Sequence, residues 1–254
     1  SPSERLNWRC AMIRSSRLFA VQGAVRSDFS QDALHRRPAG LTPRGSRQQR
    51  QSFLKSLLRR ARGRARRAGT REEVEPIRSE LFSVERLEQH AESLAAHQPT
   101  TSTATSGRSL VARLRDNERV LLAAYASIAG AAAKGRSITP AAEWLLDNYH
   151  LVEQQVREVR TDLPAGYYRQ LPKLSDGPLA GYPRVFGLAW AFVAHTDSRF
   201  DPEALVRFVR AYQNVQPLSI GELWALAITL RIVLVENLSR SARHILSWRS
   251  TRED

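Results

Sequence analysis

Six side chains in one short stretch are suited to contact a sugar, a nucleotide or a protein partner. They lie in YYRQLPKLSDGPLAGYP, which starts at residue 167, and are Tyr167, Tyr168, Arg169, Gln170, Lys173 and Tyr182. Aromatic rings offer flat contact surfaces, while arginine and lysine bind phosphate or hydroxyl groups. Anchoring of this loop onto neighbouring helices explains the same residues and is the favoured interpretation. Contact with a partner or a sugar is the alternative.

Arg231 interrupts the apolar run from Leu223 to Val235. A guanidinium that is buried needs a compensating partner, because an unpaired charge in the interior is costly. We expect an ion pair with an acid on another helix, and contact with a bound anion is the second interpretation.

One helix face carries residues that resemble part of a metal site: Glu143, Asp147, His150 and Gln154. A carboxylate three residues before a histidine can bind a metal, but di-iron bundles need that pair on two helices together with further carboxylates. The face also lies opposite the apolar stripe of the same helix. We therefore expect it to face solvent.

The segment HTDSRFD, from His195 to Asp201, gathers a histidine, two aspartates and an arginine between two predicted helices. No nucleophile or partner carboxylate is spaced to complete an acid–base site. Turn formation and helix capping explain Asp197, Ser198 and Asp201. The sequence thus predicts no catalytic, cofactor-binding or metal-binding residue in this chain, and it leaves open whether the protein is an enzyme.

The elements that would position these residues are helices, since apolar side chains recur at helical spacing and no segment alternates like a strand. Thr139 and Pro140 form a helix start, and Ser219 with Glu222 forms a capping box. We predict an all-α, multi-helix bundle of five or six helices. They are expected at about residues 72–97, 108–134, 140–163, 185–194, 202–212 and 220–246.

Charge divides the chain. The net charge is +14, and residues 1–70 hold 17 Lys and Arg against 3 acids, so residues 71–254 are neutral. We predict a disordered Arg-rich tail over 1–70, a first helix over 71–98, a Thr/Ser linker over 99–107 and a helical domain over 108–254.

The tail admits several interpretations. Its arginines most simply form a solvated charge run, with contact to anionic lipid or nucleic acid as the alternative. Its composition also resembles a transit peptide, and part of it could be upstream sequence read as protein. Cys10 is the one cysteine, which excludes a disulfide framework, and no apolar run reaches the roughly 20 residues that span a bilayer.

Four segments carry a resemblance to a known family. They are ELFSVERLEQHAESLA, ITPAAEWLLDNYHLVEQQVREVRTDLPAGYYRQLPKL, GPLAGYPRVFGLAWAFVAHTDSRFD and LSIGELWALAITLRIVLVENL. In this order they resemble the N-terminal region of bacterial cyclic β-1,2-glucan synthases, glycosyltransferases of the family 84 type. The resemblance covers about residues 77–242 and does not include the tail.

The resemblance implies UDP-glucose-dependent polymerisation and cyclisation of glucan by a large inner-membrane enzyme, with UDP-glucose and a divalent metal bound in a downstream domain. This chain has no D-x-D motif and no Q-x-x-R-W motif. We therefore expect a helical structural or regulatory platform without its own active site, either truncated or separately encoded. The implied partners are the rest of the synthase and its membrane region, on the cytoplasmic side of the bacterial inner membrane.

Two other functions remain open from the sequence. One is a stand-alone helical interaction module, and the other is nucleic-acid binding through the basic tail, although no specific nucleic acid is expected. The sequence does not determine the oligomeric state.

Overall fold

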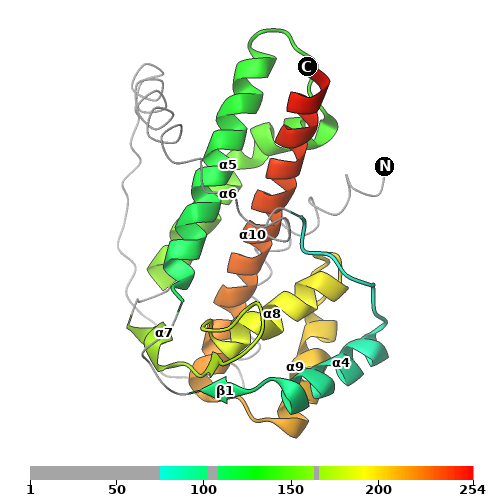
Figure 1. The fold of residues 1–254 in the computed structure, drawn as a ribbon, viewed down its shortest axis with the longest axis vertical. Coiled ribbons are helices and arrows are strands. Elements are labelled where there is room, and N and C mark those ends of the chain that lie inside the picture. Colours follow the sequence, from blue (N-terminus) through cyan, green and yellow to red (C-terminus); the bar gives the residue numbers. More distant parts are fainter. Residues whose placement is uncertain (1–74, 102–107, 163–165, 254) are drawn as a thin grey trace, which may run out of the picture.

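The computed structural model describes residues 75–101, 108–162 and 166–253, and these form an all-α fold (Figure 1). The predicted tail and residues 102–107 and 163–165 lie outside the described residues. The helices are α4 (Val84–His97), α5 (Leu110–Ala132), α6 (Pro140–Asp162), α7 (Tyr167–Gln170), α8 (Arg184–His195), α9 (Pro202–Val215) and α10 (Ile220–Glu253). Apart from the single turn α7, these are the six helices of the predicted bundle.

The 34-residue helix α10 is the centre of the molecule. It contacts α5, α6 and α8, and its middle is buried around nearly the whole circumference. Figure 1 shows α5 and α6 running beside α10, while α8 lies against its first half with α9 and α4 further to the same side. A helix buried on most sides must be apolar or must bring its own polar partners. Helix α10 does both.

The first helix of the described chain, α4, belongs to the same core. Helix α4 packs against α9 and also contacts α8. Leu87 and Ala91 of α4 join the continuous hydrophobic core together with Phe192 of α8 and Phe208 of α9.

A short ribbon joins two distant segments. Strand β1 (Thr100–Thr101) pairs antiparallel with β2 (Lys173–Leu174), so two threonines of the predicted linker are held against the loop. Leu174 packs closely on α8, where a Cβ at Gly187 would lie 2.9 Å from Leu174 Cδ1. Glycine permits this close approach. The division of the chain into tail, first helix, linker and helical domain stays a prediction.

Helix ends follow the expected capping chemistry. The backbone N–H of Ala142 donates to Thr139 Oγ1 at 3.3 Å, and the side chain of Asp201 caps α9. In the capping box, Ser219 N–H donates to Glu222 Oε2 at 2.9 Å and Glu222 N–H donates to Ser219 Oγ at 3.3 Å. These contacts confirm the predicted starts of α6, α9 and α10.

Two boundaries differ from the expected ones. Helix α4 begins at Val84 after the N-cap Ser83, whose side chain accepts from Arg86 N–H, and not near residue 72. A side-chain cap at Ser83 sets the start. The apolar residues of the expected helix face recur at helical spacing and are Leu81, Val84, Leu87, Ala91 and Leu94. Leu81 nevertheless lies outside the observed helix and is 63% exposed. Helix α10 continues beyond residue 246, to Glu253.

Among the described residues, no helix combines the length and the apolar character needed to cross a membrane. Arg231, Glu236 and Arg240 divide the apolar surface of the longest helix, α10.

Two leucines of the first predicted helix provide a matched test of this packing. Leu87→Ala should lower the free energy of unfolding by about 2 to 5 kcal/mol, because it leaves a cavity between α4 and the core. Leu81→Ala should change it by no more than about 0.5 kcal/mol. Urea unfolding of both variants measures the difference, and equal losses would mean that α4 is not part of the core.

Candidate functional site

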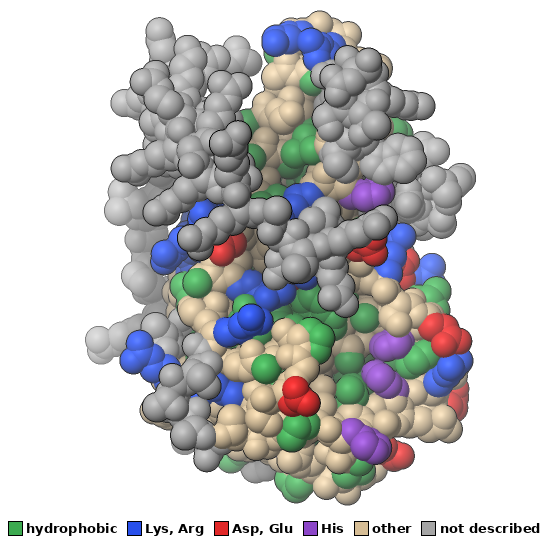
Figure 2. All heavy atoms as spheres, viewed as in Figure 1, with side chains coloured by type: hydrophobic (Ala, Val, Ile, Leu, Met, Phe, Trp, Pro, Cys, Tyr) green, Lys and Arg blue, Asp and Glu red, His purple; other side chains and the backbone are tan. Residues whose placement is uncertain are grey.

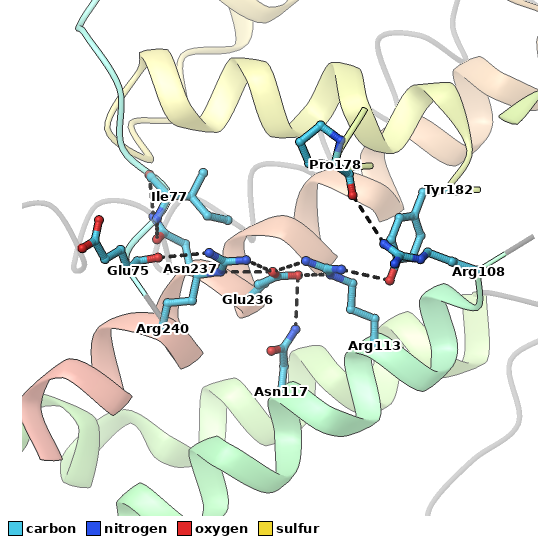
Figure 3. A network of polar contacts seen from close by, with 10 residues as sticks. All are labelled: Glu75, Ile77, Arg108, Arg113, Asn117, Pro178, Tyr182, Glu236, Asn237 and Arg240. Carbon is cyan, nitrogen blue, oxygen red and sulfur yellow. Dashed lines mark hydrogen bonds and ion pairs between the residues drawn. The ribbon is translucent and has the colours of Figure 1, made fainter. Parts of the chain in front are cut away.

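A cluster of buried charged side chains lies between α5 and α10. Glu236 of α10 is 3% exposed, and arginines bind both of its carboxylate oxygens. Arg113 of α5 forms a bidentate pair with it, Nε to Oε2 and Nη2 to Oε1. Arg240, one turn further along α10, donates to Oε1 from Nη2 at 2.8 Å and from Nε at 3.1 Å. Figure 3 shows the two guanidinium groups reaching the carboxylate from opposite sides.

Aromatic and amide groups surround this cluster. Arg113 Nη1 donates to the hydroxyl of Tyr182 at 2.9 Å, and its guanidinium carbon lies 5.0 Å from the centre of the same ring. The guanidinium of Arg240 lies 4.9 Å from the ring centre of Trp190 on α8. Asn117 of α5 is 3.5 Å from Glu236 Oε2. The cluster therefore ties α5, α8 and α10 to the Tyr182 end of the loop.

The arginines fix the protonation state of Glu236. Burial on its own raises the pKa of this carboxyl, but the hydrogen bonds and charges of Arg113 and Arg240 outweigh burial and hold the pKa below the ordinary 4.5. Glu236 is thus ionised near neutral pH and acts only as an acceptor. A general acid for glycosidic chemistry needs the opposite, a carboxyl whose pKa is raised.

A second buried pair lies at the start of α8 and α10. Arg184 Nη2 donates to Glu222 Oε2 at 2.8 Å and to the carbonyl of Pro217 at 2.7 Å. Burial raises the pKa of Glu222, yet hydrogen bonds from Arg184 and Ser219 hold it below 4.5. The same carboxylate that completes the capping box of α10 therefore also anchors α8.

The structure separates the six predicted loop residues into an anchored group and an exposed group. Tyr168, Lys173 and Tyr182 are buried. Lys173 Nζ donates to the carbonyl of Arg169 at 3.0 Å, and the half-buried Tyr167 donates from its hydroxyl to the carbonyl of Gly221 at 2.5 Å. These contacts match the anchoring interpretation.

Exposure differs within the proposed contact surface. The fold covers the side chains of Tyr168, Lys173 and Tyr182. Arg169 and Gln170 are exposed on α7. A partner or sugar contact of the loop stays a prediction, and these two exposed residues are the ones open to it.

Arg231 is buried at 3% exposure and points toward acids of α6. Its Nη1 lies 3.6 Å from Asp162 Oδ2 and 3.8 Å from Glu158 Oε2. Arg231 of α10 thus lies near two acids of another helix, α6, as the ion-pair interpretation expected. Contact with a bound anion stays a prediction.

The polar face of α6 is exposed at all four of the residues that resembled part of a metal site: Glu143, Asp147, His150 and Gln154. Gln154 Nε2 donates to Glu158 Oε1 at 2.8 Å along the same helix. Within the described residues, no group of three or more His, Cys, Asp and Glu side chains is placed to hold a metal ion.

The segment between α8 and α9 serves as a turn. Asp197 and Ser198 have φ angles of 48° and 60°, a left-handed conformation that short polar side chains tolerate. Asp197 pairs with Arg78 Nε at 3.0 Å, and Ser198 Oγ accepts from Asn237 Nδ2 at 2.8 Å.

Sequence reasoning missed the Arg113–Glu236–Arg240 cluster and the partner of Glu222. A signal for the first was present, since Glu236 and Arg240 stand four residues apart in an otherwise apolar helix. Arg113 lies more than a hundred residues earlier, and no local pattern relates it to Glu236.

Comparison with known proteins adds the evidence for relationship. No protein-family model matches the chain. A stretch of 176 residues is 44% identical to the cyclic β-(1,2)-glucan synthase NdvB of Rhizobium meliloti strain 1021. The chain is related to this glucan synthase. The match covers 69% of this chain but about 6% of the length of the synthase. The predicted resemblance is confirmed, and the match concerns a small part of a much longer protein.

Neutralising Glu236 measures how much the Arg113–Glu236–Arg240 cluster contributes to the free energy of unfolding. We expect Glu236→Gln to lower the free energy of unfolding by about 3 to 5 kcal/mol near neutral pH, because two buried guanidinium groups lose their counter-charge. The contribution of a carboxylate with a lowered pKa is present above the unfolded-state value of about 4.3 and is lost as the pH falls through the folded-state value. The stability difference between wild type and variant should therefore shrink in acid.

Urea unfolding across the acidic range measures this difference. The exposed Glu80, which pairs with Arg86, provides a matched control, and Glu80→Gln should leave stability near that of the wild type. A Glu236→Gln penalty that stays constant down to low pH would contradict an ionised Glu236.

Proposed function

We propose that this chain forms a helical platform of a cyclic β-(1,2)-glucan synthase, with a structural or regulatory role and no active site of its own. The observation that carries the proposal is the 44% identity to the R. meliloti glucan synthase over 69% of this chain. Its partner would be the rest of a synthase and its membrane region, on the cytoplasmic side of the bacterial inner membrane. UDP-glucose and a divalent metal would bind elsewhere in that synthase.

The state of the buried carboxylates supports a non-catalytic role. Glu222 and Glu236 are the buried acids among the described residues. Arginines hold the pKa of each below its ordinary value. Cleavage of glycosidic bonds uses two carboxyl groups, one of which must donate a proton. Neither buried glutamate is suited to that step.

The use of the other polar groups supports a platform. Arg113, Arg184 and Arg240 each bind a glutamate that lies on α10. The contacts of Arg113 and Arg184 fix α5 and α8 relative to α10, and all three guanidinium groups are committed to internal partners. A rigid helical body of this kind suits the positioning of neighbouring parts of a large enzyme.

The isolated chain provides the first test. We expect no release of glucose from UDP-glucose and no extension of a β-(1,2)-glucan, with or without a divalent metal ion, because transfer chemistry would reside outside this chain. Chromatography of the products detects either reaction. Turnover by the purified chain would overturn the platform proposal.

A chimera tests the relation to the synthase and the remaining loop hypothesis together. The 176-residue segment of the R. meliloti synthase is replaced by the matching part of this chain, and cyclic glucan is measured in cells that lack their own synthase. We expect glucan production. An inactive chimera that accumulates to normal levels would count against the proposed role.

Within an active chimera, Arg169→Ala combined with Gln170→Ala should lower glucan output while the fold persists, because both side chains are exposed on α7. Arg157→Ala, at an arginine with a 74% exposed side chain on α6, is the matched control and should leave output unchanged. Unchanged output from the double variant would exclude a contact role for α7.

A further inference from the structure

Residues 75–83, here called the strap, cross from α10 to the end of α8 before α4 begins. The strap is held by backbone contacts at both ends. Ile77 N–H donates to Asn237 Oδ1 at 2.6 Å, and the Glu75 carbonyl accepts from Arg240 Nη1 at 3.1 Å. Further along, Ser79 N–H donates to the carbonyl of Ala194 at 3.0 Å. Ile77 is the buried hydrophobic side chain of the strap. Because one buried side chain provides limited apolar packing, these polar contacts contribute much of the attachment.

The far end of the strap is fastened by two histidines. The Phe82 ring stacks on His195 with a centroid distance of 3.9 Å and an interplanar angle of 13°. His90 of α4 meets both rings edge-on, at 5.5 Å from Phe82 and 4.6 Å from His195. The Phe82 N–H donates to the His195 carbonyl at 3.1 Å, and His195 Nδ1 lies 2.8 Å from the Glu80 carbonyl. Figure 2 shows histidine side chains close together on the side of the molecule where Figure 1 places α4.

The charged groups around Phe82, His90 and His195 would compensate little for a new positive charge on His90. The guanidinium of Arg86 lies 4.5 Å from the Phe82 ring centre and binds Glu80 at 2.7 Å. The other carboxylates nearby are committed as well. Asp197, after α8, pairs with Arg78 of the strap, and Glu88 of α4 pairs with Arg207 of α9 at 2.7 Å.

We propose that the strap is a pH-sensitive latch, in which protonation of His90 beside His195 and Arg86 releases residues 75–83 from α8 and α10. A positive charge on His90 is unfavourable there, because the ring is partly desolvated and lies 4.6 Å from the His195 ring. Release separates the strap from Asn237 and Arg240, so it also loosens one side of the Arg113–Glu236–Arg240 cluster. The latch closes at neutral pH, when the His90 ring is uncharged.

The direction of the effect follows from proton linkage. Burial and then the neighbouring His195 lower the pKa of His90 from its ordinary 6.5. The folded latch therefore binds fewer protons than the open one. A group with a lowered pKa contributes stability above its unfolded-state value, and that contribution is lost as the pH falls below about 6.5 toward the folded-state value.

Hydrogen exchange of the whole chain tests the proposal. Protection factors of the Ser79 and Phe82 amides are compared with that of Val156 in α6 at about pH 7.5 and about pH 5, a range that spans histidine titration. We expect the two strap amides to lose protection at the lower pH relative to Val156. His90→Gln should abolish that loss. His97→Gln, at an exposed histidine of the same helix, should retain it.

Two outcomes would overturn the latch. One is a loss of strap protection in acid that persists in His90→Gln, since another group would then be responsible. The other is an equal loss at Val156, which would indicate global unfolding. His90→Phe, which keeps an aromatic ring but cannot be protonated, replaces His90→Gln if the glutamine variant does not fold.

Discussion

The arrangement of the helices depends on compensation of the negative charge of one buried carboxylate, that of Glu236. Glu236 lies in the middle of α10, where the helix is surrounded, and an ionised carboxylate in such a position is tolerated only with close and well-oriented partners. Arg240 supplies one partner from the same helix and Arg113 supplies the other from α5. The requirement for charge compensation therefore fixes the register of α5 against α10. It also aligns Tyr182 and the loop that carries it.

The same principle recurs at the other end of the central helix. Glu222 caps α10 through Ser219 and binds Arg184 at the start of α8, so one carboxylate sets both where α10 begins and where α8 lies. Bidentate arginine–carboxylate contacts specify orientation as well as proximity. Three helices are thus held by directional contacts in addition to apolar packing, which suits a body that keeps its shape inside a larger assembly.

The strap, residues 75–83, precedes α4 and attaches to this rigid body at α10 and α8. Its attachments include Asn237 and Arg240, close to the central cluster, and the ring stack at His195. Helix packing on α10 provides stability, while the strap adds a contact whose strength depends on protonation.

Several features could be predicted from the sequence because their causes are local. Helical periodicity gave the all-α class, and the caps at Thr139, Asp201 and Ser219 gave three helix starts, since a cap acts within three residues. Motif order also indicated the relation to a glucan synthase. The expected start of α4 near residue 72 was wrong, because residues 75–83 form the strap and the cap at Ser83 sets where the helix begins.

What only the tertiary structure decided depends on residues that are distant in sequence. Leu81 and Leu87 look alike in the pattern, yet one is exposed and the other is buried, because the strap turns away before Ser83. The loop tyrosines and Lys173 resembled a contact surface, but packing against α10 and α8 buried most of them. Sequence spacing does not predict that Arg113 contacts Glu236 or that His90 contacts His195. These pairs form because helix packing brings the two side chains together. The role of a buried charge or ring therefore depends on which side chain the neighbouring helix places beside it.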